Sequence, residues 1–129
     1  MQEVTFRNCK IMGLNFTKCH SLLLSFQFSN SVLAMSVFSY MDLKETNFKN
    51  SQIQDCTFIG ADLSGANFEN TDLKNSRFHE TNLSRANFYK AVNYNIDPTQ
   101  NKVKKAIFSL PEAISLLSPF EIELFSVYE

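Results

Sequence analysis

The chain has 129 residues, 44% of them hydrophobic, which is enough for one domain with a core of its own. Its formal net charge of −1 gives no strong attraction to nucleic acid or to an anionic membrane, and no apolar run approaches the roughly 20 residues of a membrane-spanning helix. Residues 1–4 lack the basic start and apolar stretch of a secretory signal, so we expect a cytoplasmic protein.

The N-terminal segment begins a repeat with a five-residue period. Phe6, Ile11 and Phe16 are each five residues apart. The spacing from Phe16 to Leu23 is seven, so two extra residues interrupt the period there. We interpret them as a small insertion at a corner around Cys19-His20, with a partner-contacting loop as the alternative.

From residue 28 to residue 93 the same period runs without interruption. Thirteen of the fourteen positions in this series are Leu, Ile or Phe, and each is termed a centre. The residue two before the centre is Ala, Ser, Thr or Cys in twelve of the fourteen cases, and the residue between them is often Asp or Asn. The predicted core centres, including one later in the chain, are Phe28, Leu33, Phe38, Leu43, Phe48, Ile53, Phe58, Leu63, Phe68, Leu73, Phe78, Leu83, Phe88 and Phe108.

A period of five with two inward positions fits neither a helix nor a long strand. The small residue and the centre are two apart, so on a short extended segment both point into the core, and a corner should follow two residues after the centre. All three glycines, Gly13, Gly60 and Gly65, fall at that position, where tight turns need positive φ. The centres alternate Phe with Leu or Ile, so a coil of four five-residue sides would stack like residues in columns.

Two consecutive units, Ala61–Gly65 and Ala66–Asn70, read Ala-Asp-Leu-Ser-Gly and Ala-Asn-Phe-Glu-Asn. In this tandem pattern the chain resembles the pentapeptide-repeat family, whose signature is Ala-Asp/Asn-Leu/Phe-x-x. The resemblance covers residues 4–93 and implies a right-handed quadrilateral parallel β-helix of about four to five coils. It is specific for the fold and only weakly specific for function.

After the repeat the chain is predicted to continue within the same single domain, residues 1–129. We expect an excursion from the solenoid over residues 94–105 and a last repeat at residues 106–108. Phe108 would then share the final coil with Leu83, Phe88 and Asn93.

The C-terminal end is predicted to cap the solenoid, as repeat proteins require. Ser109 and Glu112 have the spacing of a capping box for a short α-helix over residues 109–118. Residues 119–129 are predicted as a strand or tail, because residues 120–124 alternate between apolar and acidic side chains. The apolar face of the helix would consist of Leu110, Ala113, Ile114 and Leu117.

No set of side chains has the spacing of a catalytic or metal site. Cys9 and Cys56 occupy the small inward position and are interpreted as packed hydrophobes. His79 follows a centre and should point into solvent. Asp62 and Asp72 should bond corner or backbone groups rather than act as an acid–base pair. We therefore expect a protein that is not an enzyme and has no catalytic residues, metal or cofactor.

The flat faces of such a rod favour protein binding, so we interpret the chain as a protein–protein interaction scaffold. The resemblance implies an alternative, a DNA-mimicking binder of type II topoisomerases such as gyrase, which presents an acidic rod. Residues 4–93 carry nine basic and seven acidic residues, a net +2, which disfavours the mimic. Lys102, Lys104 and Lys105 form too short a basic cluster to support direct nucleic-acid binding.

The repeat begins within the first few residues, with no helix or polar cap before it. Unpaired backbone groups should therefore lie open at this end and invite pairing with another chain. Either the chain is a piece of a longer repeat protein, or two copies meet at this end as a homodimer. In the second case the expected contacts are Phe6, Ile11 and Met12.

Overall fold

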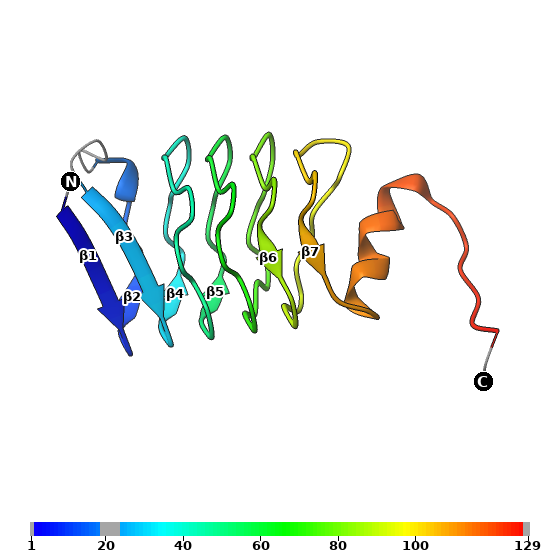
Figure 1. Ribbon diagram of the computed structural model, residues 1–129, viewed down its shortest axis with the longest axis horizontal. Coiled ribbons are helices and arrows are strands. Elements are labelled where there is room, and N and C mark those ends of the chain that lie inside the picture. Colours follow the sequence, from blue (N-terminus) through cyan, green and yellow to red (C-terminus); the bar gives the residue numbers. More distant parts are fainter. Residues whose placement is uncertain (1, 19–23, 128–129) are drawn as a thin grey trace.

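The computed structural model describes residues 2–18 and 24–127 as a parallel β-solenoid (Figure 1). The predicted right-handed parallel β-helix is confirmed, with about four turns. The regular elements are short, because each side of a coil spans only five residues. They are β1 (Gln2–Arg7), β2 (Lys10–Met12), β3 (Leu24–Ser29), β4 (Val32–Ala34), β5 (Gln52–Gln54), β6 (Asn87–Phe88), β7 (Ile107–Phe108) and the 3₁₀ helices Phe16–Lys18 and Glu112–Phe120.

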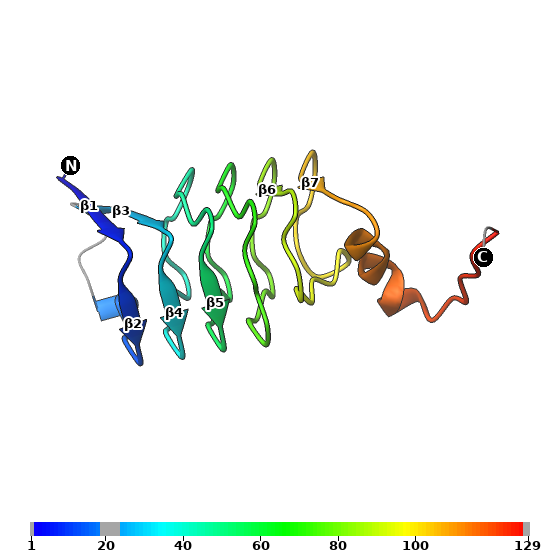
Figure 2. The same ribbon diagram turned by 90° about the horizontal axis from the view of Figure 1, so that it is seen from below.

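The strand pairs are parallel and, from residue 24 onward, displaced by 20 residues. β4 pairs with β5 so that Leu33 lies opposite Ile53. Single bridges continue the same register on the other sides of the coil, such as that between Asp62 and Asn82. Figure 2 shows the coils following one another along the rod. Each coil therefore bonds to the coil before it and the coil after it, at the spacing of about 4.8 Å between adjacent strands.

The corners are tight turns with one residue in the left-handed region. The carbonyl of the centre accepts a hydrogen bond from the N–H three residues later, as between Phe58 O and Ala61 N at 3.1 Å. The residue two after the centre has positive φ, which a type II turn requires, with 70° at Gly60, 69° at Gly65 and 56° at Asn70. The corner position predicted from the three glycines is confirmed.

The Asp or Asn before each centre stabilises the turn that follows it. Asp62 Oδ1 accepts a hydrogen bond from the Ser64 N–H at 3.0 Å, and Asp72 Oδ1 accepts one from the Lys74 N–H at 3.2 Å. This local bond satisfies a backbone donor near the corner. The expectation that these two carboxylates bond the backbone is confirmed.

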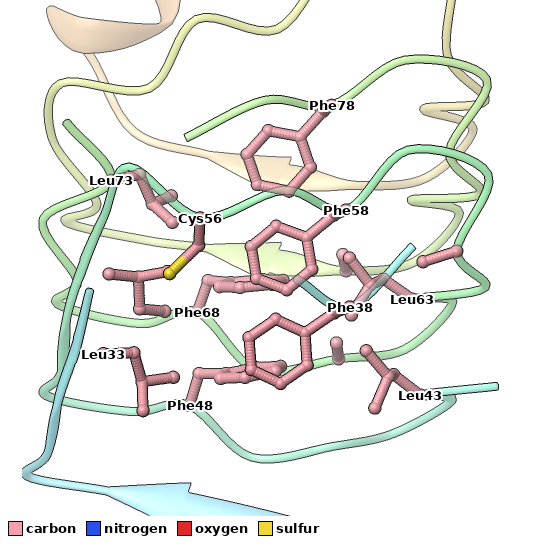
Figure 3. Packing of buried hydrophobic residues seen from close by; sticks show 14 of the residues in the cluster. Leu33, Phe38, Leu43, Phe48, Cys56, Phe58, Leu63, Phe68, Leu73 and Phe78 are labelled. Atoms are coloured by element: carbon pink, nitrogen blue, oxygen red, sulfur yellow. The ribbon is translucent and has the colours of Figure 1, made fainter. Parts of the chain in front are cut away.

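Two columns of Phe and two columns of aliphatic side chains fill the interior (Figure 3). Phe68 stacks on Phe48 and Phe88 with ring centroids 4.8 and 4.9 Å apart, and it meets Phe58 and Phe78 edge-on at 6.2 Å. Each inner ring therefore has both favoured aromatic geometries at once. Twelve centres are no more than 2% exposed, namely Phe28, Leu33, Phe38, Leu43, Phe48, Ile53, Phe58, Leu63, Phe68, Leu73, Leu83 and Phe88; Phe78 is 6% exposed, and Phe108 is half-buried.

Replacing Gly60 with Ala should destabilise the solenoid by about 1–3 kcal/mol. The left-handed φ is unfavourable for a residue with a Cβ, and that Cβ would lie 2.5 Å from the ring of Tyr40. Gly13 is a matched control, because its φ is +63° but nothing lies within 4 Å of a Cβ built on it. Denaturation of both Ala variants separates backbone strain from the clash. Equal losses would show that the Tyr40 ring moves aside without cost.

The first coil is displaced from the second by 22 residues instead of 20. Phe6 lies opposite Phe28, and Asn15 pairs with Val37. Two residues are therefore inserted after Phe16, in agreement with the sequence spacing. The corner insertion or loop predicted around Cys19-His20 lies outside the described residues.

The excursion predicted over residues 94–105 is wrong, because the 20-residue register continues through it. Lys102 pairs with Asn82, and the Leu83 N–H donates to Lys102 O at 2.7 Å. Val103 packs against the core as a further centre. The coil before Phe108 is therefore complete.

Different positions fill the core in this last coil, which explains why its periodicity is lost in the sequence. Asn93, predicted as a centre, is exposed and has a φ of 60°. Tyr94 and Ile96 are buried instead, with 6% and 2% exposure. The Tyr94 ring lies 6.0 Å from that of Phe88 and 5.5 Å from that of Phe108.

The C-terminal helix is a 3₁₀ helix from Glu112 to Phe120, not the α-helix predicted over residues 109–118. The predicted capping box does not form. The Ser109 hydroxyl instead accepts a hydrogen bond from the Lys90 N–H at 2.9 Å, which ties it to the preceding coil. The helix therefore begins later, after Pro111, without a side-chain cap.

The face that this helix turns to the solenoid also differs from the prediction. Leu116 packs against the core, whereas Ile114 and Leu117 are 48% and 39% exposed. The prediction assumed α-helical spacing, but a 3₁₀ helix has three residues per turn and aligns Ala113 with Leu116. Within residues 2–18 and 24–127, no helix is long and apolar enough to cross a membrane.

The strand predicted within residues 119–129 does not form in the part of the chain that the structure describes. Glu121 adopts a left-handed φ of 52° and donates its N–H to Ser118 O, which ends the helix. The following residues leave the solenoid as an extended segment (Figure 1). A strand needs a neighbouring strand for its hydrogen bonds, and this segment has none beside it within the described chain.

Candidate interaction surface

Three positions of every five-residue unit point outward: those before and after the centre and the corner itself. On the coil containing Leu73 and Phe78 these positions carry Asp72, Lys74 and Arg77. The equivalent positions one face and two coils earlier carry uncharged residues. The outward side chains, rather than the core, therefore distinguish one part of the rod from another.

One corner near the N-terminal end presents apolar side chains to solvent. Met12 lies opposite Ala34 in the β2–β4 pair, and the Val37 N–H donates to Leu14 O at 2.8 Å, so two successive coils hold these residues side by side. Met12, Leu14 and Met35 are 55%, 49% and 55% exposed. We define the apolar corner as Met12, Leu14, Val32, Ala34, Met35 and Val37.

The apolar corner is local. The 20-residue register carries its second coil to Gln54, Asp55 and Thr57 and then to Lys74, Asn75 and Arg77. The same geometry is therefore polar and charged two coils later. Contiguous exposed apolar surface of this kind marks binding sites on soluble proteins.

Sequence reasoning missed the apolar corner, although a signal was present. The residues flanking the centre Leu33 are Val32 and Ala34, where most units carry Asp, Asn, Lys or Ser. Of the predicted end contacts, Phe6 is half-buried and stacks on Phe28 at 5.1 Å, and Met12 is exposed. Ile11 is only 7% exposed within the core, so it is not available as a surface contact.

Charge is unevenly distributed on the face outside Leu43, Leu63 and Leu83. At one end Lys44 Nζ lies 3.6 Å from Asp42 Oδ2 and 4.0 Å from Asp62 Oδ2. These exposed pairs add little stability but reduce the acidity of that end. The opposite end of the face is basic, with Arg85, Lys102, Lys104 and Lys105.

The titratable groups do not gather into a reactive centre among the residues that the structure describes. His79 Nε2 lies 3.9 Å from Glu80 Oε1, with both side chains largely exposed. In the described ranges no three His, Cys, Asp or Glu side chains are close enough to hold a metal ion. A polar groove of about 780 Å³ opens where Asn93 leaves the regular path, between Lys74 and Arg77 on one coil and Asn95 on the next.

Cys56 should be alkylated far more slowly in the folded protein than in the unfolded one. Burial, more than the nearby Asp55 carboxylate, raises the pKa of its thiol from 9.0 to about 11, so the thiolate is about a hundredfold scarcer near pH 8. Iodoacetamide labelling followed by peptide mass spectrometry would measure this, with protein in urea as the control. Fast labelling of Cys56 under native conditions would show that its coil opens.

The same pKa makes the folded state less stable at high pH. The folded protein holds the proton more tightly than the unfolded chain, so stability is complete below about pH 9 and falls as the pH rises toward 11. Cys56→Ala lacks this contribution. The gap in unfolding free energy between the two proteins should therefore narrow in that range, in urea titrations at each pH.

Comparison with known proteins gives one family and several solved structures. Residues 31–108 match the family model of the pentapeptide repeat region. No curated protein sequence matches the chain. A trypsin-treated form of QnrB1, a plasmid-mediated fluoroquinolone resistance protein, is 21% identical with a TM-score of 0.45, covering 94% of this chain and 58% of that one. The chain thus spans less than two thirds of that structure.

Two further structures are pentapeptide repeat proteins of cyanobacteria. Rfr23 from Cyanothece 51142 is 22% identical with a TM-score of 0.37, covering 82% of this chain and 84% of that one. HetL from Nostoc sp. strain PCC 7120, involved in heterocyst differentiation regulation, is 19% identical with a TM-score of 0.34, covering 82% and 52%.

The family match covers more than half of the chain and coincides with the part in which the 20-residue register is unbroken. The small inward residue, the Asp or Asn that bonds the turn and the buried Leu or Phe recur there in each unit. The chain belongs to the pentapeptide repeat family.

Proposed function

We propose that this protein is a non-enzymatic scaffold that binds a protein partner through the apolar corner. The observation that supports the proposal is the cluster of three side chains, Met12, Leu14 and Met35, that are about half exposed on adjoining coils. Exposed apolar side chains are unfavourable in water and are usually retained where a partner covers them. Methionine suits such a surface, because its flexible side chain adapts to a partner's shape.

The rigid solenoid would hold this surface in a fixed arrangement. The six residues of the apolar corner flank buried centres, and coil-to-coil hydrogen bonds fix their backbone. Binding therefore orders few additional residues, which lowers its entropic cost. A partner with a complementary apolar surface is expected to lie across the corner.

A photo-crosslinking residue at Met35 tests the proposal, with the same residue at Asn75 as the matched control. Asn75 lies at the same corner two coils later, with the same left-handed backbone. We expect a discrete adduct from lysate at Met35 and none at Asn75. The partner, once identified and purified, should bind Met35→Asp and Val37→Asp at least about tenfold more weakly than the natural protein. Equal adducts at both positions, or unchanged affinity, would contradict the proposal.

The alternative is a DNA-mimicking binder of gyrase, and the charges weigh against it. Residues 4–108 contain twelve basic and eight acidic residues, a net +4, and duplex DNA is strongly negative along its whole length. We therefore expect no protection of gyrase from a fluoroquinolone in a supercoiling assay. Protection at sub-micromolar protein would favour the mimic over the scaffold.

A further inference from the structure

The N-terminal end of the solenoid is an open strand edge. In later coils of the same face, the residue before the centre directs both backbone groups at the preceding coil: the Asn67 N–H donates to Thr46 O, and the Asn67 carbonyl accepts from the Phe48 N–H. The equivalent residue of β1 is Thr5, and no coil precedes it among the described residues. The half-buried Val4 and Phe6 lie at the same end of the core.

The C-terminal segment has the opposite deficiency. Phe120, Ile122 and Leu124 are each 52–53% exposed and alternate with Glu121 and Glu123. After the bond from the Glu121 N–H to Ser118 O, residues 122–125 make no hydrogen bond within the described chain. This segment is patterned as a strand, but it has no neighbouring strand with which to pair.

We propose that residues 120–125 of one copy add as a parallel strand to the open edge of β1 in a second copy. Phe120, Ile122 and Leu124 would extend the core over Val4 and Phe6, and the segment's backbone would pair with the open groups of Glu3, Thr5 and Arg7. Such strand addition gains affinity from main-chain bonds and specificity from alternate side chains.

Charge favours this pairing over a contact between two identical ends. Residues 2–18 carry Arg7, Lys10 and Lys18 against Glu3, a net +2, and residues 119–127 carry two glutamates and no basic residue. Two N-terminal ends would repel each other, as would two C-terminal segments. The β1 edge and the C-terminal segment also lie at opposite ends of the rod (Figure 1), so the contact would join copies head to tail.

Sedimentation velocity of the full chain over about a hundredfold range of concentration tests the proposal. We expect association that weakens at high salt. Thr5→Pro removes a donor from the open edge, where proline is tolerated, and Ile122→Lys places a charge in the apolar row. Both should associate at least about tenfold more weakly, whereas Phe125→Lys, in the other row, should associate normally. Circular dichroism checks that each variant is folded, and Arg7→Glu replaces Thr5→Pro if that variant is not.

A mixture of the two defective variants distinguishes this contact from every symmetric one. Thr5→Pro retains an intact segment and Ile122→Lys retains an intact edge, so equal amounts should form a one-to-one dimer that does not grow further. A symmetric contact through either end would not be restored by mixing. A natural protein that stays monomeric throughout, or a mixture that stays monomeric, would overturn the proposal and leave the apolar corner unaffected.

Discussion

Removing the twenty residues 51–70 should leave a folded solenoid that is one coil shorter, whereas removing only the five residues 61–65 should cost about 4–8 kcal/mol of stability. The larger deletion joins Asn50 to Thr71 and places Leu73 over Leu33, so every column still stacks like on like. The smaller deletion places Phe68 over Leu43 and shifts all four sides of one coil by one column. Four mismatched contacts at about 1–2 kcal/mol each would consume most of a typical domain's stability.

Both deletions lack residues 61–65, so the difference between them reports register and not composition. Urea denaturation followed by circular dichroism would give the two unfolding free energies, and size-exclusion chromatography would show whether each chain is compact. Cooperative unfolding of the five-residue deletion with near-natural stability would mean that the Phe and aliphatic columns are interchangeable.

Truncating Phe68 to Ala should destabilise the protein by about 3–5 kcal/mol. The side chain is fully buried, and its ring loses two stacked and two edge-on neighbours. The coils above and below are held by their backbone hydrogen bonds, so the cavity cannot readily collapse. Chemical denaturation would measure the loss.

Two variants bracket that result. Phe108→Ala should cost less, because Phe108 is half-buried and stacks only on Phe88, at 5.0 Å. Lys74→Ala removes an outward side chain and should change stability by less than about 0.5 kcal/mol. A loss below about 1 kcal/mol for Phe68→Ala would show that the stacked columns contribute little.

The sequence predicts this fold well wherever one residue type recurs at one position of the coil. The alternation of Phe with Leu or Ile predicted the stacked columns, and glycine at the corner predicted the left-handed turns. The last coil was misread because Asn93 and Pro98 stand where centres should be, and only the three-dimensional path shows that Tyr94 and Ile96 replace them.

Other features depend on contacts that the sequence does not specify. The 3₁₀ geometry of the C-terminal helix follows from packing against the final coil and from the bond between Ser109 and Lys90. The apolar corner could be recognised only once the register placed Met12 beside Ala34, because the two residues are 22 apart. Val32 and Met35 resemble core residues in the sequence and are distinguished from them only by the side of the strand they occupy.

The constant spacing of 20 residues between paired segments also shapes how the chain folds during its synthesis. A newly made segment finds its neighbour already formed about 20 residues earlier, so every loop that closes is short and of similar entropic cost. At about 5–20 residues per second a ribosome delivers one coil every one to four seconds, far more slowly than a strand docks. Folding would therefore advance from the N-terminal coil, with the exposed edge moving along the nascent chain until the C-terminal helix covers the last ring of Phe108.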